Sequence, residues 1–317
     1  MNNPVLSALL PVVFVIAIGY IAGRAQWIRP EATKDLSNLV FLVLTAALLF
    51  RTMSRVHISE LDFAPVAIYF AVAGLLFFAL LVIWGTNSRA AVLALASIFS
   101  NNVMIGIPLV GLAYGESALV LLFTLISLHS LVLLTSVTVV LELLQAHEMA
   151  RAGNAPTQQR WRTVWQAVKS AVIHPVPLPI IAGLLFSLTG WALPDVIDRP
   201  LLLLGNAFGP VALLLVGVTL AQVRLSGQWL GALQVAALKT LLHPLLMALA
   251  GWGLGLRGQD LTVLVVAAAL PVGANVFLFS QRYQKAQDLV TASMAFSTVL
   301  AFGSVSLVMT LLPRLLG

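Results

Sequence analysis

Residues 100–111 have the sequence SNNVMIGIPLVG and lie within an apolar run long enough to cross a bilayer. Two amides, two glycines and a proline stand in the middle of that run. A helix that faces lipid keeps its backbone hydrogen bonds to itself, because each freed N–H or C=O group costs several kcal/mol in hydrocarbon. An interruption is tolerated where it is buried in protein or lines a wet cavity. The sequence therefore predicts a broken helix here, with Pro108 as one structural cause of the break.

A second interruption of the same kind occurs late in the chain. Residues 270–277 have the sequence LPVGANVF, again inside a long apolar run. Two interrupted helices in corresponding positions of two halves are the best sequence indication of the binding site of a secondary transporter. We therefore predict that Pro271 marks a second break and that a substrate site lies between the two.

The composition is that of a membrane protein. Hydrophobic residues make up 60% of the 317 residues and charged residues 9%, and the mean hydropathy is +1.02. A soluble domain carries roughly a quarter charged residues, so we predict a polytopic protein of the lipid bilayer. The formal charge of +6 comes from loops between spans, which favours a role in orientation over a nucleic-acid partner. The absence of cysteine excludes disulfides and thiolate metal sites.

The predicted fold class is an all-α polytopic membrane protein with ten transmembrane helices. The predicted spans are residues 5–23, 36–50, 63–84, 90–112, 117–144, 172–192, 201–221, 230–254, 261–281 and 289–312. They form a first five-helix repeat (1–144), a cytoplasmic linker (145–171) and a second five-helix repeat (172–317). Within the linker, residues 161–169 fit either a short helix in the membrane interface or an ordinary solvated connector.

The distribution of Lys and Arg predicts the orientation. Loops after odd-numbered spans hold Arg24, Arg29, Lys34, Arg89, Arg151, Arg160, Arg162, Lys169, Arg224, Arg282 and Lys285. Loops on the other side hold Arg51, Arg55, Arg199, Arg257 and Arg314. Because positive charge accumulates on the cytoplasmic side, we expect both termini outside and the linker inside.

Five spans per half is an odd number, so an internal repeat has to be inverted. Asn38 and Asn206 occupy similar places in the second and seventh spans, and Asn102 and Asn275 in the fourth and ninth. Because these pairs occur in the same order along both halves, they favour an inverted repeat with broken, crossing fourth and ninth helices.

Three asparagines are the main candidates for substrate contact. Asn101, Asn102 and Asn275 lie at the two breaks, and an uncharged amide can both donate to and accept from a carboxylic group. A helix that restarts within the membrane also directs unpaired N–H groups and a positive dipole end into the gap. The alternative is that these side chains only cap the broken backbone.

Three further polar residues lie within spans. Lys239, about ten residues into its span, is a candidate for neutralising the substrate, for donating to freed carbonyls, or for reaching a membrane interface. His129, near the middle of the fifth span, is a candidate for substrate contact and for a coupling proton; the alternative is a neutral histidine bonded between helices. Thr45 is a candidate for lining the cavity or for packing helices.

Several signatures of enzymes are absent from the sequence. No span carries a pair of carboxylates, and there is no HExxH motif or phosphate-binding glycine loop. We therefore predict no catalytic residues, no metal site and no cofactor.

Five segments resemble the auxin efflux carrier family, in its bacterial branch of malonate and malate permeases. They are residues 10–20 (LPVVFVIAIGY), 100–111, 114–115 (YG), 270–283 and 296–298 (FST). The resemblance implies a scaffold from spans one, two, six and seven, a mobile domain from the other six, and a homodimer formed through the scaffold. It also implies substrate contact at Asn101 or Asn102, at Ile105, and at Asn275 with the preceding Gly273 and Ala274.

The expected function is secondary transport of a small organic anion across the bacterial inner membrane. We expect a mono- or dicarboxylate of the malonate type, moved by elevator-type alternating access. Neither break contains an acidic residue to hold sodium, which favours a sodium-independent carrier. Two alternatives remain open: a sodium-coupled organic anion symporter of the bile acid symporter type, and a non-transporting membrane receptor.

Overall fold

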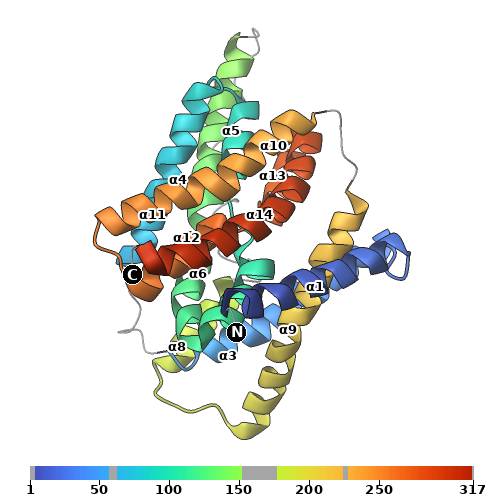
Figure 1. Ribbon diagram of the computed structural model, residues 1–317, viewed down its shortest axis with the longest axis vertical. Coiled ribbons are helices and arrows are strands. Elements are labelled where there is room, and N and C mark those ends of the chain that lie inside the picture. The colour runs from blue at the N-terminus through green and yellow to red at the C-terminus, as the bar shows by residue number, and fades with distance from the viewer. Residues whose placement is uncertain (1–3, 57–62, 152–176, 224–227, 316–317) are drawn as a thin grey trace.

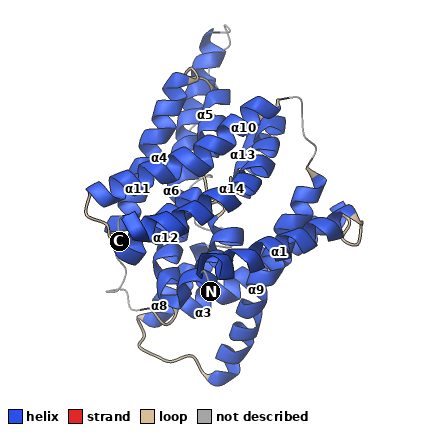
Figure 2. Ribbon diagram, viewed as in Figure 1, coloured by secondary structure: helices blue, strands red, loops and turns tan. Residues whose placement is uncertain are grey.

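The computed structural model describes residues 4–56, 63–151, 177–223 and 228–315, and these contain helices and loops but no named strand (Figure 1, Figure 2). Six helices are long and apolar enough to cross a membrane: Pro30–Met53, Ala64–Ile83, Asn102–Gln145, Asp195–Gln222, Trp229–Gly253 and Gln287–Leu312. Shorter apolar helices cover Leu9–Arg24, Leu178–Ser187 and Gly258–Ala269. The described chain thus has the helical architecture of a multi-pass membrane protein.

The described residues of the first half form eight elements. They are α1 (Pro4–Arg24), α2 (Pro30–Asn38), the π-helix η1 (Leu39–Leu44), α3 (Thr45–Met53), α4 (Ala64–Ile83), α5 (Ser88–Ala96), the π-helix η3 (Asn102–Gly106) and α6 (Ile107–Arg151). Helix α6 is interrupted at Gly115, where φ is 78° and ψ is −169°. That conformation is essentially restricted to glycine, so the chain changes direction there, between the predicted fourth and fifth spans.

Eight further elements are formed by the part of the second half that the structure describes. They are α8 (Pro177–Ser187), α9 (Asp195–Gln222), α10 (Trp229–Ala237), the π-helix η4 (Leu238–Leu242), α11 (His243–Gly253), α12 (Gly258–Ala269), α13 (Ala274–Tyr283) and α14 (Gln287–Leu315). Of the linker predicted at 145–171, the first part continues α6 to Arg151. The rest, including 161–169, lies outside the described residues.

Helices α1 and α9 pack so closely that glycine is required on both. A Cβ atom on Gly217 of α9 would collide with the backbone of Ile16 and Tyr20 in α1. A Cβ atom on Gly19 of α1 would collide with the backbone of Leu214 in α9. Small residues allow membrane helices to approach in this way and to gain dispersion energy over a long contact. The two helices therefore behave as one rigid unit.

Helices α3 and α8 join this unit. A Cβ atom on Gly183 of α8 would lie 2.7 Å from the carbonyl oxygen of Phe50 in α3, so these helices are also in close contact. Arg51 and Arg55, at the end of α3, both bind Asp198 in the first turn of α9, at 2.9 and 2.6 Å. Figure 1 shows α1, α3, α8 and α9 in the lower part of the molecule, and α4, α5, α10, α11 and α13 in the upper part.

Candidate functional site

The first predicted interruption follows α5. The helix ends at Ala96, and helical structure resumes at Asn102, in η3. Asn101 is the N-cap of the resumed helix: its side-chain oxygen accepts a hydrogen bond from the backbone N–H of Met104, at 3.3 Å. Asparagine is among the best N-cap residues because it satisfies an N–H group that has no partner within the helix.

Pro108 lies beyond the non-helical segment. It is the second residue of α6, two residues after η3, whereas the non-helical segment lies before Asn102. A proline inside a helix removes one hydrogen bond and crowds the carbonyl four residues earlier, which here belongs to Met104 of the π-helix η3. The role of Pro108 as a cause of the break stays a prediction.

The second interruption lies between α12 and α13 and pairs with the first. The N–H of Asn101 donates to the carbonyl of Pro271 at 2.9 Å, and the N–H of Gly273 donates to the carbonyl of Phe99 at 3.0 Å. Ser100 and Val272 thus form an isolated antiparallel bridge. Backbone groups that are freed from helices need partners inside a membrane, and the two breaks supply them to each other.

Side chains complete the hydrogen bonding of the second break. Lys239, on η4, is fully buried and donates to the carbonyls of Ala268 and Leu270, at the end of α12. On α14, Ser297 accepts from the N–H of Val272 at 3.0 Å, and Ser304 donates to the carbonyl of Ala269 at 3.4 Å. Of the three roles considered for Lys239, its position matches the donor to freed carbonyls, and its amino group is buried within the protein.

At the first break, some buried side-chain atoms lack a hydrogen-bond partner. The Tyr69 hydroxyl of α4 lies 3.1 Å from Ser100 Oγ. The Asn102 side chain is next to that hydroxyl and 2% exposed, yet neither its Oδ1 nor its Nδ2 meets a partner at hydrogen-bond geometry. A buried polar atom without a partner costs about 1–3 kcal/mol. Such an atom in a well-packed protein requires an explanation, and a ligand that supplies the partner is one.

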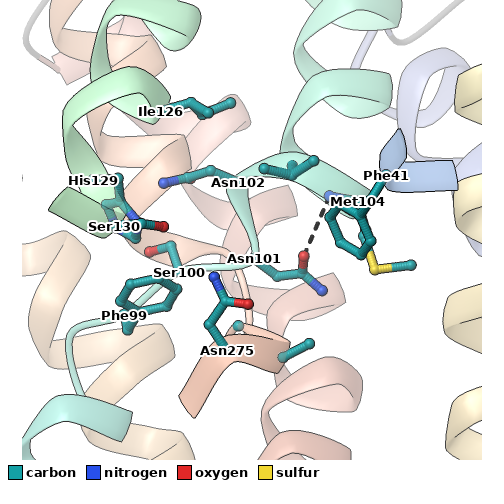
Figure 3. A pocket seen from close by; sticks show the side chains of 13 residues that line it. Phe41, Phe99, Ser100, Asn101, Asn102, Met104, Ile126, His129, Ser130 and Asn275 are labelled. Carbon is teal, nitrogen blue, oxygen red and sulfur yellow. Dashed lines mark hydrogen bonds between the residues drawn. The ribbon is translucent and has the colours of Figure 1, made fainter. Parts of the chain in front are cut away.

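A cavity of about 40 Å³ lies where the two breaks meet. Its polar lining consists of Ser100, Asn101, Asn102, His129, Ser130 and Asn275, and its other lining of Phe41, Phe99, Val103, Met104, Ile126, Gly273 and Ala274. Figure 3 shows Asn101 turned toward Met104, whereas Asn102 points the other way, toward His129 and Ser130. The space holds about three water molecules, so a larger ligand requires the walls to separate.

His129 of α6 forms part of the cavity wall. It is 4% exposed, its ring centroid lies 4.4 Å from that of Phe99, and its Nε2 atom has no partner. The cavity therefore has unpartnered hydrogen-bonding atoms on two neighbouring side chains, Asn102 and His129. Among the residues that the structure describes, no group of three His, Cys, Asp or Glu side chains is arranged to hold a metal ion.

The structure brings six of the predicted site residues together. Asn101, Asn102, His129, Gly273, Ala274 and Asn275 all line the cavity. Of these, Asn275 is half-buried, and its side chain forms no hydrogen bond with the described residues.

The remaining predicted site residues lie elsewhere. Ile105 lines a smaller cavity of about 10 Å³, together with Leu109 and Leu270. Thr45 is fully buried, and its hydroxyl donates to the carbonyl of Val40 within the helix, at 2.7 Å.

Among the polar side chains near the breaks that were not predicted are Tyr69, Ser297 and Ser304. Tyr69 stands alone in an apolar span, where it resembles an ordinary core aromatic residue. The signal that could have identified it is that a buried tyrosine hydroxyl needs a hydrogen-bond partner. Ser297 lies within the FST segment, but a serine inside a membrane helix more often bonds to its own backbone.

Comparison with known proteins identifies the family. A family model described as membrane transport protein matches residues 4–309. The "Putative malonate transporter" of Rhizobium meliloti (strain 1021) is 26% identical over 94% of this chain and 92% of its own. The "Uncharacterized transporter YfdV" of Escherichia coli (strain K12) is 25% identical over 92% of both chains, and "Auxin efflux carrier component 8" of Arabidopsis thaliana is 22% identical over 94% of both. The chain therefore belongs to the auxin efflux carrier family of membrane transport proteins, a family of transporters rather than enzymes.

Proposed function

We propose that this protein is a secondary transporter of a small organic anion and that the crossing of the two breaks is its substrate site. The observation that carries the proposal is a polar cavity at the crossing, two of whose lining residues, Asn102 and His129, have buried side-chain atoms without a hydrogen-bond partner among the described residues. Such groups are destabilising, because they lose the hydrogen bonds that water gives them in the unfolded chain. A ligand with hydrogen-bonding oxygens removes that cost, which makes binding favourable at this place.

The proposed ligand is a mono- or dicarboxylate of the malonate type. The resumed helix at Asn102 and helix α13 both begin at the cavity, so their positive dipole ends favour an anion there. The Asn102 amide adds a donor, and the residues that line the cavity include no Asp or Glu to repel a carboxylate. The name of the Rhizobium meliloti relative also supports malonate as the first compound to test.

The proposed topology is ten spans in two inverted five-helix repeats, residues 1–144 and 172–317. In the first repeat the spans correspond to α1, to α2 with η1 and α3, to α4, to α5 with η3 and the start of α6, and to the rest of α6. In the second they correspond to α8, to α9, to α10 with η4 and α11, to α12 with α13, and to α14. The antiparallel pairing of the two breaks supports an inverted relation.

The proposed mechanism is an elevator movement, in a homodimer formed through the scaffold. The close packing of α1, α3, α8 and α9 supports their role as a rigid scaffold. A second cavity, of about 520 Å³, is bounded by α1, α3 and α9 on one side and by residues 107–112 of α6 on the other. Loose packing at this boundary supports sliding of the remaining helices along the scaffold, because close packing resists such movement.

The proposed location is the bacterial inner membrane, with both termini outside and the linker in the cytoplasm. This orientation rests on the excess of Lys and Arg in the loops after odd-numbered spans.

We further propose that transport does not require sodium. Neither break supplies an acidic residue. Other carriers bind sodium with exposed carbonyl groups at helix ends. Here two such carbonyls, at the end of α12, already accept hydrogen bonds from the amino group of Lys239. The driving force is then the membrane potential, which is worth about 2.3 kcal/mol per charge per 100 mV, or a proton.

The test is carboxylate flux into liposomes that contain the purified protein. We expect saturable uptake of malonate or of another small carboxylate, and an unchanged rate when potassium or choline replaces sodium at fixed pH. Liposomes without protein serve as the control for leakage. Flux that collapses without sodium would contradict the proposed coupling and favour a symporter of the bile acid type. Binding of a carboxylate with no flux would favour the receptor.

A further inference from the structure

Two buried histidines both lie close to the ring of one tyrosine. The Tyr69 ring centroid is 6.0 Å from that of His129 and 5.4 Å from that of His243. His129 is 4% exposed and His243 is fully buried. His129 Nε2 and both ring nitrogens of His243 have no hydrogen-bond partner. Imidazole nitrogens are strong donors and acceptors, so their isolation inside the protein requires a reason.

The two histidines differ in one respect that bears on function. His129 lines the cavity at the crossing of the breaks, and His243 does not. A ligand in the cavity can therefore touch His129, beside Asn102 and Ser130 (Figure 3), whereas His243 is not among the residues that line the cavity. The chain thus contains one buried histidine that lines the cavity and a second buried histidine that does not, and the second can serve as a control for the first.

The surroundings of His129 contain a positive group but no negative one. Tyr69 and Phe70 of α4 and Phe99 before the first break pack against its ring. Lys239 of η4 is the basic residue that acts on it, and His243 of α11 contacts the ring of Tyr69. Among the described residues no carboxylate acts on either histidine. A buried imidazolium needs a counter-charge, and the described residues around His129 supply none.

A carboxylate in the cavity supplies the missing counter-charge. It would lie against the His129 Nε2 atom, where an ion pair in a water-poor site is strong. The protonated ring then donates a charge-assisted hydrogen bond to the carboxylate. The neutral ring, in contrast, would present either a weaker donor or a lone pair that repels the anion. The bound anion and the proton therefore stabilise each other.

We propose that the substrate anion and one proton bind together, with the proton taken from solution onto the imidazole of His129. The inference rests on the proposed function and adds the coupling to it. Only a proton is transferred, from water to the ring, and the ring changes from imidazole to imidazolium. Because coupling between two ligands is reciprocal, a fall in pH tightens anion binding by the same factor by which the anion tightens proton binding. A monocarboxylate is then carried without net charge.

The experiment is a count of protons taken up on binding. Calorimetry at one pH in two buffers with different ionisation enthalpies gives that number for malonate or for the carboxylate that binds best. Substrate carboxyl groups are largely ionised above about pH 7, so the substrate itself contributes little. We expect roughly one proton per anion, and a Kd that rises roughly tenfold per unit between about pH 7 and pH 8.

The matched variants are His129→Gln and His243→Gln. In His129→Gln, proton uptake should fall to zero and the dependence of Kd on pH should disappear, because glutamine donates a hydrogen bond but takes no proton. In His243→Gln, both should be retained. Size-exclusion profiles and melting curves check that each variant is folded.

Three results would overturn the inference. The first is anion binding to the unaltered protein without proton uptake. This result would contradict the coupling but not the proposed transport function, and it can be obtained without any variant. The second is proton uptake that persists in folded His129→Gln. The third is a protein that binds none of the carboxylates, which removes the proposed substrate class and the coupling with it.

Discussion

Replacing Asn102 by leucine should abolish carboxylate transport and leave the ligand-free protein at least as stable as the unaltered one. Leucine branches at Cγ as asparagine does but has no hydrogen-bonding atoms. A hydrogen bond to a charged ligand is worth about 1.5–3 kcal/mol, which is roughly ten- to a hundredfold in affinity. The buried amide atoms meet no partner at hydrogen-bond geometry among the described residues, although the Tyr69 hydroxyl lies beside them, so their replacement removes a desolvation cost. Flux into liposomes and thermal melting of the purified protein measure the two effects.

The neighbouring substitution Asn101→Ala is the matched control for Asn102→Leu. Asn101 caps the resumed helix through Met104, and loss of a cap costs about 0.5–2 kcal/mol of stability. We therefore expect the opposite profile: a lower melting temperature and a smaller loss of affinity. Normal transport by Asn102→Leu would place the substrate site elsewhere. A marked loss of its stability would show that the amide has a partner within the protein.

Replacing Lys239 by methionine should destabilise the protein strongly. Methionine keeps an unbranched side chain of similar length but cannot donate hydrogen bonds. The carbonyls of Ala268 and Leu270 would then lose the amino group that binds them. Each unsatisfied buried carbonyl costs about 1–3 kcal/mol, so the loss should be about 2–6 kcal/mol. The measurement is the melting temperature in one detergent.

The control for Lys239→Met is Lys285→Met. Lys285 lies at the surface, with its side chain 37% exposed and 3.8 Å from Glu148, and a surface ion pair contributes about 0–1 kcal/mol. Its removal should barely change the melting temperature. Equal stability of Lys239→Met and the unaltered protein would mean that water or another donor satisfies the two carbonyls, and that Lys239 has a different role.

The sequence was most informative about the helix breaks themselves. Asn, Gly and Pro inside an apolar run are local signals, because their effect on the backbone does not depend on the rest of the chain. The hydrogen-bond partner of each freed backbone group, in contrast, cannot be predicted from local sequence. No local pattern indicates that Asn101 donates to Pro271, because residues so distant in sequence are brought together by tertiary packing.

The roles of individual side chains were less predictable for a related reason. Asn101 and Asn102 are adjacent and chemically identical, yet one caps a helix and the other points into the cavity (Figure 3). Only the direction of the backbone at the break separates them. Similarly, the choice among three roles for Lys239 depended on which face of its helix packs against α12. Thr45 was placed by its residue type near the cavity, but its hydroxyl bonds within its own helix.

The central claim, that the cavity at the crossing is the substrate site, can be tested with one introduced cysteine. The sequence contains no cysteine, so Ser130→Cys places a single thiol on the cavity wall with the change of one atom. Thr86→Cys, in the exposed loop after α4, is the control. The measurement is the rate at which a small thiol reagent modifies each protein, with and without the transported carboxylate. We expect the carboxylate to slow modification at position 130 in proportion to its occupancy and to leave position 86 unaffected. An unchanged rate at position 130, under conditions in which the same protein transports the carboxylate, would contradict the account.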